Sequence, residues 1–230
     1  NHNAEPGGET DFVLWVENTG TVTDTFTVSI KSNDGGFTID IEDGYETIIL
    51  SKESRKPLII NVKISSSSEG LLHAYLEVVS GGDAKERAEV RIDVDTREKF
   101  GNQTVIGDSL NVHYAGILAS DARLFDTSME DIWDNYMHRR TGVTNSNKHT
   151  DALASEHIGC IEKDNPSDNC EGSKRMIDGF DSKTIGMYEG QTLAVRIPAK
   201  DAYGAQQNPD DPDGLAGYDL IFIINVTSII

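Results

Sequence analysis

In the first half of the chain, apolar and polar side chains alternate over three separate stretches. The apolar members are Phe26, Val28 and Ile30, then Leu58, Ile60, Val62 and Ile64, and then Ala88, Val90, Ile92 and Val94. A period of two places the apolar side chains of an extended strand on one face and the polar ones on the other. Antiparallel sheets with one buried and one solvated face have this pattern. The stretches therefore predict antiparallel strands.

Turn-forming residues separate these stretches. Clusters of Gly, Asn, Asp and Ser occur at residues 18–20, 33–36, 42–44, 65–70 and 81–83. About seven short strands spaced in this way are typical of a β-sandwich. The run from Phe12 to Ile30 also resembles immunoglobulin-like domains of secreted proteins, which implies a spacer or docking module without catalytic residues. We therefore expect an all-β immunoglobulin-like sandwich over residues 1–98, ending at the charged stretch 96–101.

The second half mixes strands with a short helix. Strand patterns occur on both sides of a polar turn near residue 121, and again at Thr192–Ile197 and Asp219–Val226. A short helix is expected near Phe180–Gly186, after a long irregular segment from Thr127 to Lys174. This order predicts an α+β domain with an antiparallel sheet.

Charge and hydropathy narrow the classes of partner. The formal net charge is −19 and hydrophobic residues make up 37% of the chain, so a packed core is expected and general disorder is not. The negative charge argues against nucleic acid and anionic lipid as partners. No apolar run has the length of a membrane span; the longest late one is Leu220–Ile224.

Three features favour an extracytoplasmic location. The sequence begins at Asn1 rather than Met, so we expect a signal peptide or an anchor upstream. Cys160 and Cys170, the only cysteines, lie ten residues apart in a loop-like region and predict a disulfide in an oxidising compartment. Asn102-Gln103-Thr104 and Asn225-Val226-Thr227 are glycosylation sequons, a triplet that also occurs by chance. We expect a secreted or surface-anchored protein.

Four pieces of the second half carry a family resemblance. They are GDSLNVHYAG at residues 107–116, LFDTS at 124–128, MIDGFDSKTIGMYEGQTLAVRIPAKDAYG at 176–204 and LIFI at 220–223. In this order and register, residues 99–230 resemble an FKBP-type peptidyl-prolyl cis-trans isomerase, with an insertion at about 129–173.

The resemblance implies an FKBP-like antiparallel sheet wrapped on a short helix, with an apolar pocket between them. It implies catalytic roles for Tyr114, Phe125, Asp126, Ile177, Tyr203 and Phe222, and substrate-binding roles for Met176, Phe180 and Leu215. Phe180 would form the pocket floor, while the Ile177 N–H and the Tyr203 hydroxyl would hold the carbonyls of the substrate. The substrates would be proline-containing polypeptides, and no cofactor or metal is needed.

The insertion allows a second hypothesis. Thr127 and Ser128 precede two acidic residues, which predicts a capped helix. The residues at helical spacing are Met129, Ile132, Trp133, Tyr136 and Met137. This stripe either packs on the parent domain or holds peptides, and in the second case the chain would be a non-catalytic peptide-binding or holdase module.

A zinc site is the alternative reading of four residues in the same segment: His149, His157, Cys160 and Cys170. They match no strong zinc signature, and a disulfide explains the cysteines more simply. The oligomeric state is not encoded in any pattern that we recognise.

Overall fold

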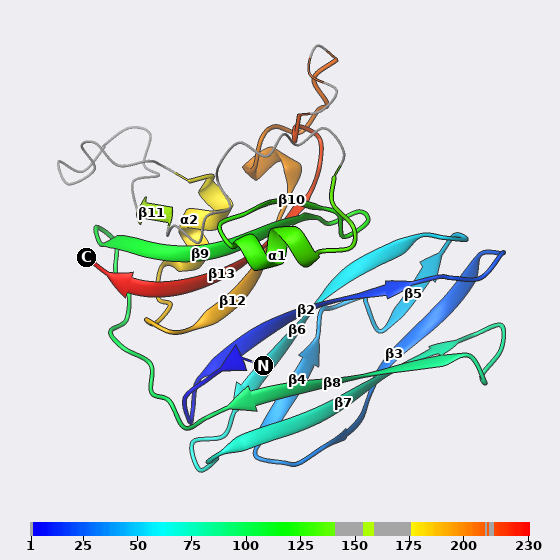
Figure 1. Ribbon diagram of the computed structural model, residues 1–230, viewed down its shortest axis with the longest axis horizontal. Coiled ribbons are helices and arrows are strands. Elements are labelled where there is room, and N and C mark those ends of the chain that lie inside the picture. Colours follow the sequence, from blue (N-terminus) through cyan, green and yellow to red (C-terminus); the bar gives the residue numbers. More distant parts are fainter. Residues whose placement is uncertain (1, 141–153, 159–175, 210, 212–213) are drawn as a thin grey trace. The chain divides into compact units, whose positions relative to one another are not determined.

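The chain is mostly β, as the alternation predicts. We analysed a computed structural model that describes residues 2–140, 154–158, 176–209, 211 and 214–230 (Figure 1). It divides into two compact units, Asn1–Phe100 and Gly101–Ile230. No helix among the described residues is long and apolar enough to cross a membrane.

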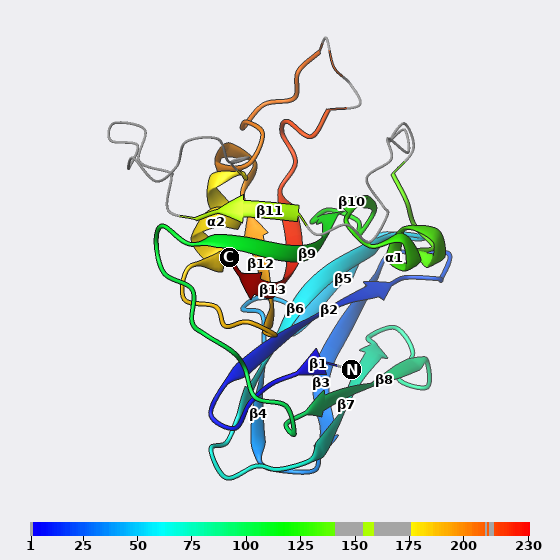
Figure 2. The ribbon, with the colours of Figure 1, turned by 60° about the vertical axis from the view of Figure 1, so that its left-hand side comes forward.

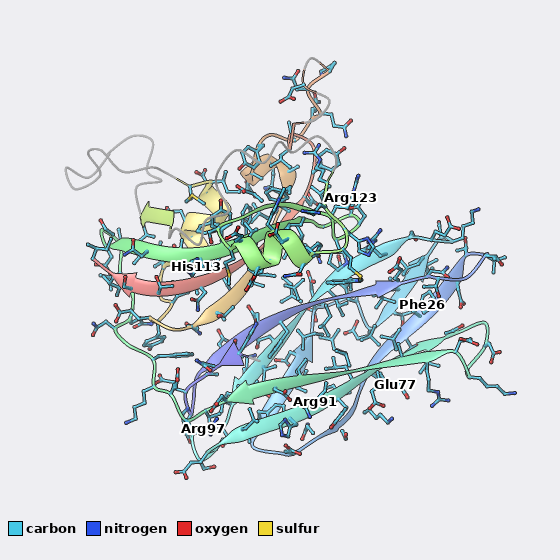
Figure 3. All side chains as sticks on the ribbon, in the orientation of Figure 1. Phe26, Glu77, Arg91, Arg97, His113 and Arg123 are labelled. Carbon is cyan, nitrogen blue, oxygen red and sulfur yellow. The ribbon has the colours of Figure 1, made fainter. Side chains whose placement is uncertain are left out.

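The first unit contains two sheets that share one core. The larger sheet has the order β1-β8-β7-β3-β5 and the smaller has the order β2-β6-β4. The strands are β1 (His2–Asn3), β2 (Glu9–Glu17), β3 (Asp24–Asn33), β4 (Phe37–Ile41), β5 (Thr47–Leu50), β6 (Arg55–Ile64), β7 (Leu71–Ser80) and β8 (Arg87–Asp95). Buried side chains from both sheets form a single apolar cluster. The outward face of the larger sheet carries ion pairs such as Arg91–Asp93 at 2.8 Å and Arg87–Glu77 at 3.4 Å; Figure 3 labels Arg91 and Glu77.

The predicted alternation holds fully in β6 and only partly in β3 and β8. Leu58, Ile60, Val62 and Ile64 are all buried. In β8 only Ile92 and Val94 are buried, whereas Ala88 and Val90 are exposed. In β3 a register shift against β7 follows Ile30, whose side chain is exposed. The pattern thus identified the strands but not where along them burial stops, which depends on the facing sheet.

The partly buried ring of His2 makes the stability of this unit depend on pH. It stacks on the ring of Phe12 with centroids 4.2 Å apart, and burial lowers the pKa of His2 from 6.5 to about 4. Because the folded pKa is depressed, the stabilisation is complete above pH 6.5 and is lost as the pH falls towards 4. We expect the free energy of unfolding to fall by about 2–3 kcal/mol over this window. Unfolding curves of wild type and His2→Phe, which stacks without titrating, will check this; His73→Gln serves as the control. Parallel curves for wild type and His2→Phe would contradict it.

The second unit is one antiparallel sheet with a short helix against it. The sheet has the order β10-β9-β13-β12, and β11 pairs with β9 on the same side as β10 (Figure 2). The elements are β9 (Ser109–Leu118), β10 (Leu124–Thr127), α1 (Glu130–Asn135), β11 (Ala154–His157), α2 (Asp178–Thr184), β12 (Thr192–Ile197), the short 3₁₀ helix η2 (Ala199–Asp201) and β13 (Leu220–Ile229). The helix α2 packs against β12 and β13.

The insertion differs from its prediction in two ways. Helix α1 lacks a side-chain cap because its N-cap residue is Met129 rather than a hydroxyl residue. The Thr127 hydroxyl donates to the Tyr114 carbonyl at 2.7 Å and accepts the Met129 N–H at 3.2 Å. The helix ends before Tyr136, so Met137 lies outside the helical period and is 77% exposed, while Trp133 is buried. The strand β11 was not predicted, since its polar sequence shows no periodicity. Cys160 and Cys170 lie outside the described residues, and their disulfide stays a prediction.

The two sequons have different surroundings. The Asn225 side-chain amide donates to the Gln191 carbonyl at 3.2 Å and to the Thr192 hydroxyl at 3.0 Å, and Val226 beside it is fully buried. A glycan on Asn225 would therefore disrupt the β12–β13 edge. Asn102 is exposed, with its amide 3.4 Å from the Glu189 carboxylate, and only this sequon is compatible with the fold.

Candidate active site

The helix α2 brings the first part of the candidate site against the sheet. Its first turn begins at the Ile177 carbonyl, which accepts the N–H groups of Phe180 at 2.9 Å and Asp181 at 3.1 Å. Gly179 allows close packing, because a Cβ there would lie 2.6 Å from a side-chain carbon of Ile197. With Gly179 against β12, the next side chain, Phe180, is fully buried in the core between helix and sheet.

Four aromatic rings form the centre of this core. The Phe222 ring of β13 lies 5.3 Å from Phe180 and 5.5 Å from Phe125, both nearly perpendicular to it. The Tyr114 ring of β9 lies 6.1 Å from both Phe180 and Phe222. Three of these pairs are edge-to-face, which is a preferred geometry of aromatic pairs, and the Tyr114–Phe222 pair is tilted at 49°. Phe222 therefore contacts the other three rings, and we call these four residues the aromatic cluster.

A bulge explains why Phe125 and Asp126 stand next to each other. Neighbouring residues of a regular strand point to opposite faces. In β10, however, Leu124 pairs with Ile117 and Asp126 with Gly116, so Phe125 is the extra residue of a register shift. Bulges redirect side chains in this way. As a result, Phe125 packs on Phe222 while the Asp126 carboxylate still reaches the hydroxyl of Tyr114.

The polar contact at the edge of the aromatic cluster joins Tyr114 and Asp126. The Tyr114 hydroxyl donates to the Asp126 carboxylate at 2.8 Å. Burial raises the pKa of Tyr114, and the Asp126 charge raises it further. Burial also raises the pKa of Tyr203, again with a contribution from Asp126. Both phenols therefore remain neutral hydrogen-bond donors at physiological pH.

An open pocket of about 490 Å³ lies over Phe222. Its wall is apolar at the two residues before α2 and at Phe222 of β13, and charged at Asp178 of α2 and along the segment that follows β12. The lining residues are Met176, Ile177, Asp178, Lys200, Asp201, Ala202, Tyr203 and Phe222. Four sequence-predicted residues are thus in the pocket wall: Met176, Ile177, Tyr203 and Phe222. The shape offers an apolar floor with polar groups at the rim, which suits a chain segment of mixed polarity.

The other sequence-predicted residues lie around the pocket rather than in its wall. Phe180 is fully buried behind Phe222, so it supports the floor and does not form it. Tyr114, Phe125 and Asp126 join the site through the aromatic cluster. Leu215 packs against the apolar core of this unit, outside the pocket wall.

Several residues of the site were not singled out from the sequence. Asp178, Lys200, Asp201 and Ala202 line the pocket, and each lies inside the 176–204 piece, whose resemblance was the available signal. The Arg140 guanidinium lies 5.3 Å from the Tyr218 ring and donates to the Gly214 carbonyl at 2.8 Å. This contact ties residue 140 to the loop that follows Tyr203, and no pattern in the sequence indicated it.

Comparison with known proteins assigns part of the second unit to a protein family. Residues 156–227 match the family model of the FKBP-type peptidyl-prolyl cis-trans isomerase. This part of the chain is FKBP-type. The match includes α2, β12, most of β13 and all residues of the pocket wall. Tyr114, Phe125 and Asp126 lie upstream of it, on β9 and β10 of the same sheet. The resemblance seen in the sequence is therefore confirmed.

Solved structures resemble the chain only weakly. The PapD-like domain 7 of human CEP192 is 15% identical, with a TM-score of 0.33, over 42% of this chain and 78% of that one. An extracellular fragment of EsaA from Streptococcus gallolyticus is 21% identical, with a TM-score of 0.29, over 41% of this chain and 25% of that one. The Pseudomonas aeruginosa CupB2 chaperone is 8% identical, with a TM-score of 0.29, over 55% of this chain and 78% of that one. No curated protein matches this chain.

Proposed function

We propose that the protein is a peptidyl-prolyl cis-trans isomerase that acts on proline-containing polypeptides. The observation that carries the proposal is the open pocket over Phe222, with Ile177 and Tyr203 in its wall and the Tyr114–Asp126 hydrogen bond beside the same aromatic cluster. The FKBP-type match over residues 156–227 supports the same activity.

The reaction needs a place where an amide can lose its planarity. Rotation about a peptide bond has a barrier of about 18–20 kcal/mol, because resonance gives the C–N bond double-bond character. The cis and trans forms of an X-Pro bond differ by only about 0.5–1 kcal/mol, so a catalyst has only to lower the barrier. Water stabilises the charge-separated planar amide at its carbonyl oxygen. An apolar pocket that excludes this water favours the twisted state.

Each polar group at the pocket then has a role in holding the substrate. In the proposed complex, the proline ring lies over Phe222, and the Ile177 N–H and the Tyr203 hydroxyl donate to substrate carbonyls. Asp126 accepts the hydrogen bond of Tyr114 at 2.8 Å and so fixes the tilt of that ring against Phe222. Phe125 and Phe180 keep the floor rigid through their edge-to-face contacts.

We further propose an immunoglobulin-like companion domain and an extracytoplasmic setting. The two-sheet sandwich of the first unit supports the former. The cysteine pair and the exposed sequon at Asn102 support the latter. The alternative, a non-catalytic holdase, would retain the pocket without accelerating rotation.

A prolyl isomerisation assay on a panel of X-Pro tetrapeptides tests the proposal. The wild-type protein should accelerate exchange, with a preference for apolar residues before proline. Tyr203→Phe should lose about 0.5–1.5 kcal/mol of transition-state binding, or roughly 2- to 13-fold in kcat/KM. Tyr188→Phe, in the same unit but outside the pocket wall, is the matched control. A wild-type rate equal to the uncatalysed rate would reject the isomerase proposal and leave the non-catalytic holdase as the remaining function.

A further inference from the structure

The loop that follows Tyr203 is closed at its base by hydrogen bonds, and we call residues 204–218 the 204–218 loop. The Gly204 carbonyl accepts the Gly217 N–H at 2.7 Å, and the Gly204 N–H donates to the Ala199 carbonyl at 2.9 Å. Both glycines have positive φ, +114° at Gly204 and +81° at Gly217, a region that glycine adopts without steric cost. Tyr203, in the pocket wall, is the residue directly before this closure. Its orientation therefore depends on how the loop is held.

The side chain of Arg140 holds the returning part of this loop. Its guanidinium donates to the Gly214 carbonyl at 2.8 Å and lies 5.3 Å from the centre of the Tyr218 ring, within the range of about 6 Å for a cation–π contact. Only 9% of Arg140 is exposed. A planar guanidinium can stack on a ring and donate a directed hydrogen bond at the same time, whereas an ammonium group is a point charge. The two contacts fix the chain on both sides of Gly217.

The backbone of Arg140 is attached to β10, the strand that carries Asp126. The Arg140 N–H donates to the Leu124 carbonyl at 2.8 Å, and Leu124 also forms a parallel bridge with Arg139. Arg140 thus connects two sides of the candidate site, β10 with Asp126 on one side and the loop after Tyr203 on the other. These sides are close enough for the Asp126 charge to raise the pKa of Tyr203.

We propose that Arg140 is a positioning residue of the isomerase site, which holds the 204–218 loop against β10 and so fixes the Tyr203 hydroxyl where it binds a substrate carbonyl. Arg140 is not among the residues that line the pocket, so it acts through Tyr203 rather than on the substrate. Hydrogen bonds weaken steeply when donor and acceptor are misaligned, and small displacements of a positioned group lower rates strongly. The inference rests on the proposed function for the role of Tyr203.

A double-mutant cycle on the full chain tests whether Arg140 acts through Tyr203. Arg140→Gln should lower kcat/KM for X-Pro tetrapeptides several-fold, and by no more than Tyr203→Phe does. In the Tyr203→Phe background the same change should cost less than about twofold, because the hydroxyl that Arg140 positions is already absent. Arg140→Lys should recover part of the rate, since it keeps the charge but not the planar fork. Arg139→Gln removes the neighbouring exposed arginine and should match wild type.

A second readout does not depend on catalysis. Burial raises the pKa of Tyr203, with a contribution from Asp126. If Arg140→Gln releases the loop, the ring becomes more exposed and this pKa should fall towards its ordinary value. Removal of a positive charge alone would raise it instead, so the direction of the change separates the two effects. NMR titration of isotope-labelled tyrosine measures the pKa, and faster hydrogen exchange of the Gly217 amide would report that the base of the loop has opened.

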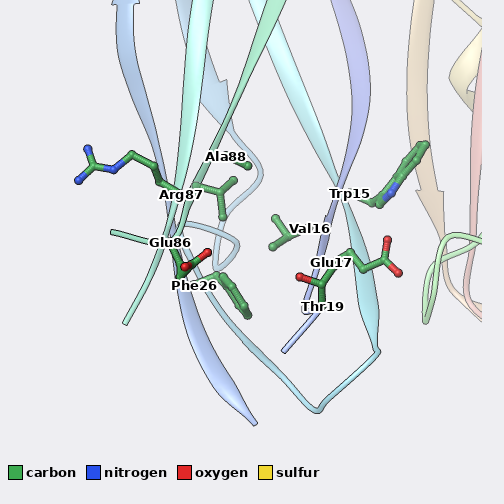
Figure 4. A pocket seen from close by; sticks show the side chains of 9 residues that line it. Trp15, Val16, Glu17, Thr19, Phe26, Glu86, Arg87 and Ala88 are labelled. Carbon is green, nitrogen blue, oxygen red and sulfur yellow. The ribbon is translucent and has the colours of Figure 1, made fainter. Parts of the chain in front are cut away.

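A control is also needed for peptide held elsewhere on the chain. The first unit has an opening of about 200 Å³, whose lining includes Val16, Phe26 and Ala88 (Figure 4). Ala88→Arg places a long side chain at that opening. It should leave both the isomerisation rate and the Tyr203 titration unchanged.

The outcomes separate the possibilities. A non-additive cycle, together with a lower pKa of Tyr203 in Arg140→Gln, supports the proposal. Additive losses, or a folded Arg140→Gln with the wild-type titration of Tyr203, overturn it. A loss with Ala88→Arg as large as that with Arg140→Gln also overturns it, because the effect would then not be specific to the loop. A wild-type protein without isomerase activity would reject the proposed function, and the titration would still decide whether Arg140 positions Tyr203. If Arg140→Gln does not fold, Arg140→Lys provides the same comparison.

Discussion

Replacing Phe222 with alanine should lower kcat/KM for X-Pro isomerisation by more than about tenfold, equivalent to about 1.4 kcal/mol of barrier. Phe222 is the residue that both lines the pocket and contacts the three other rings of the aromatic cluster. Its removal would admit water to the imide and leave Tyr114 without the ring that fixes its tilt. The measurement is the isomerisation rate on an apolar X-Pro tetrapeptide, wild type against variant.

The same substitution will cost stability, so the rate needs a folding control. Burying a phenylalanine this completely typically contributes about 3–5 kcal/mol over alanine, a large part of the stability of an ordinary domain. Phe222→Leu keeps most of the apolar volume and should fall between wild type and Phe222→Ala in rate. Phe12→Leu, a buried phenylalanine of the first unit, should leave the rate unchanged. A folded Phe222→Ala with the wild-type rate would reject the desolvation mechanism.

Substituting Gly116 with alanine should destabilise the second unit by about 1–3 kcal/mol and lower the isomerase rate. Gly116 lies on β9 opposite both Phe222 and Asp126. A Cβ at this position would lie 2.5 Å from the Phe125 Cζ atom and 3.0 Å from the Phe222 Cε1 atom. Because two strands hold both rings in place, the clash must displace the bulge of β10. Denaturant unfolding and the tetrapeptide assay will measure the two effects.

A second substitution can distinguish local crowding from a general weakening of β9. In the double variant Gly116→Ala with Phe125→Leu, the shorter side chain relieves the contact, and we expect stability to recover towards that of Phe125→Leu alone. Activity should stay low, because the edge-to-face contact with Phe222 is absent. If the two changes destabilise additively, the close approach at Gly116 is not what positions Phe125.

The alternation in the sequence predicted burial correctly where a strand has a neighbouring strand on both sides. Leu58 to Ile64 lie in β6, the middle strand of its sheet, so alternation and burial agree throughout. Ala88 and Val90 follow the same alternation on an edge and are exposed. Whether an apolar position is covered depends on the facing sheet, which is distant in sequence, and a local pattern contains no information about it.

The candidate site divides in the same way. The amino-acid sequence alone was enough to predict the mostly β character, the helix near Phe180 and the FKBP-type stretches that carry Ile177, Tyr203 and Phe222. Only the tertiary structure decided that Phe180 lies behind Phe222, that Leu215 is outside the pocket wall and that Arg140 holds the loop at Gly214. Local backbone preferences and side-chain periodicity act over a few residues and can be read along the chain. The approach of Phe222 to Gly116 joins strands far apart in sequence, so it is fixed only when the sheet forms. The bulge at Phe125 lies between the neighbouring strands β9 and β10, but the ring that Phe125 contacts belongs to the distant strand β13.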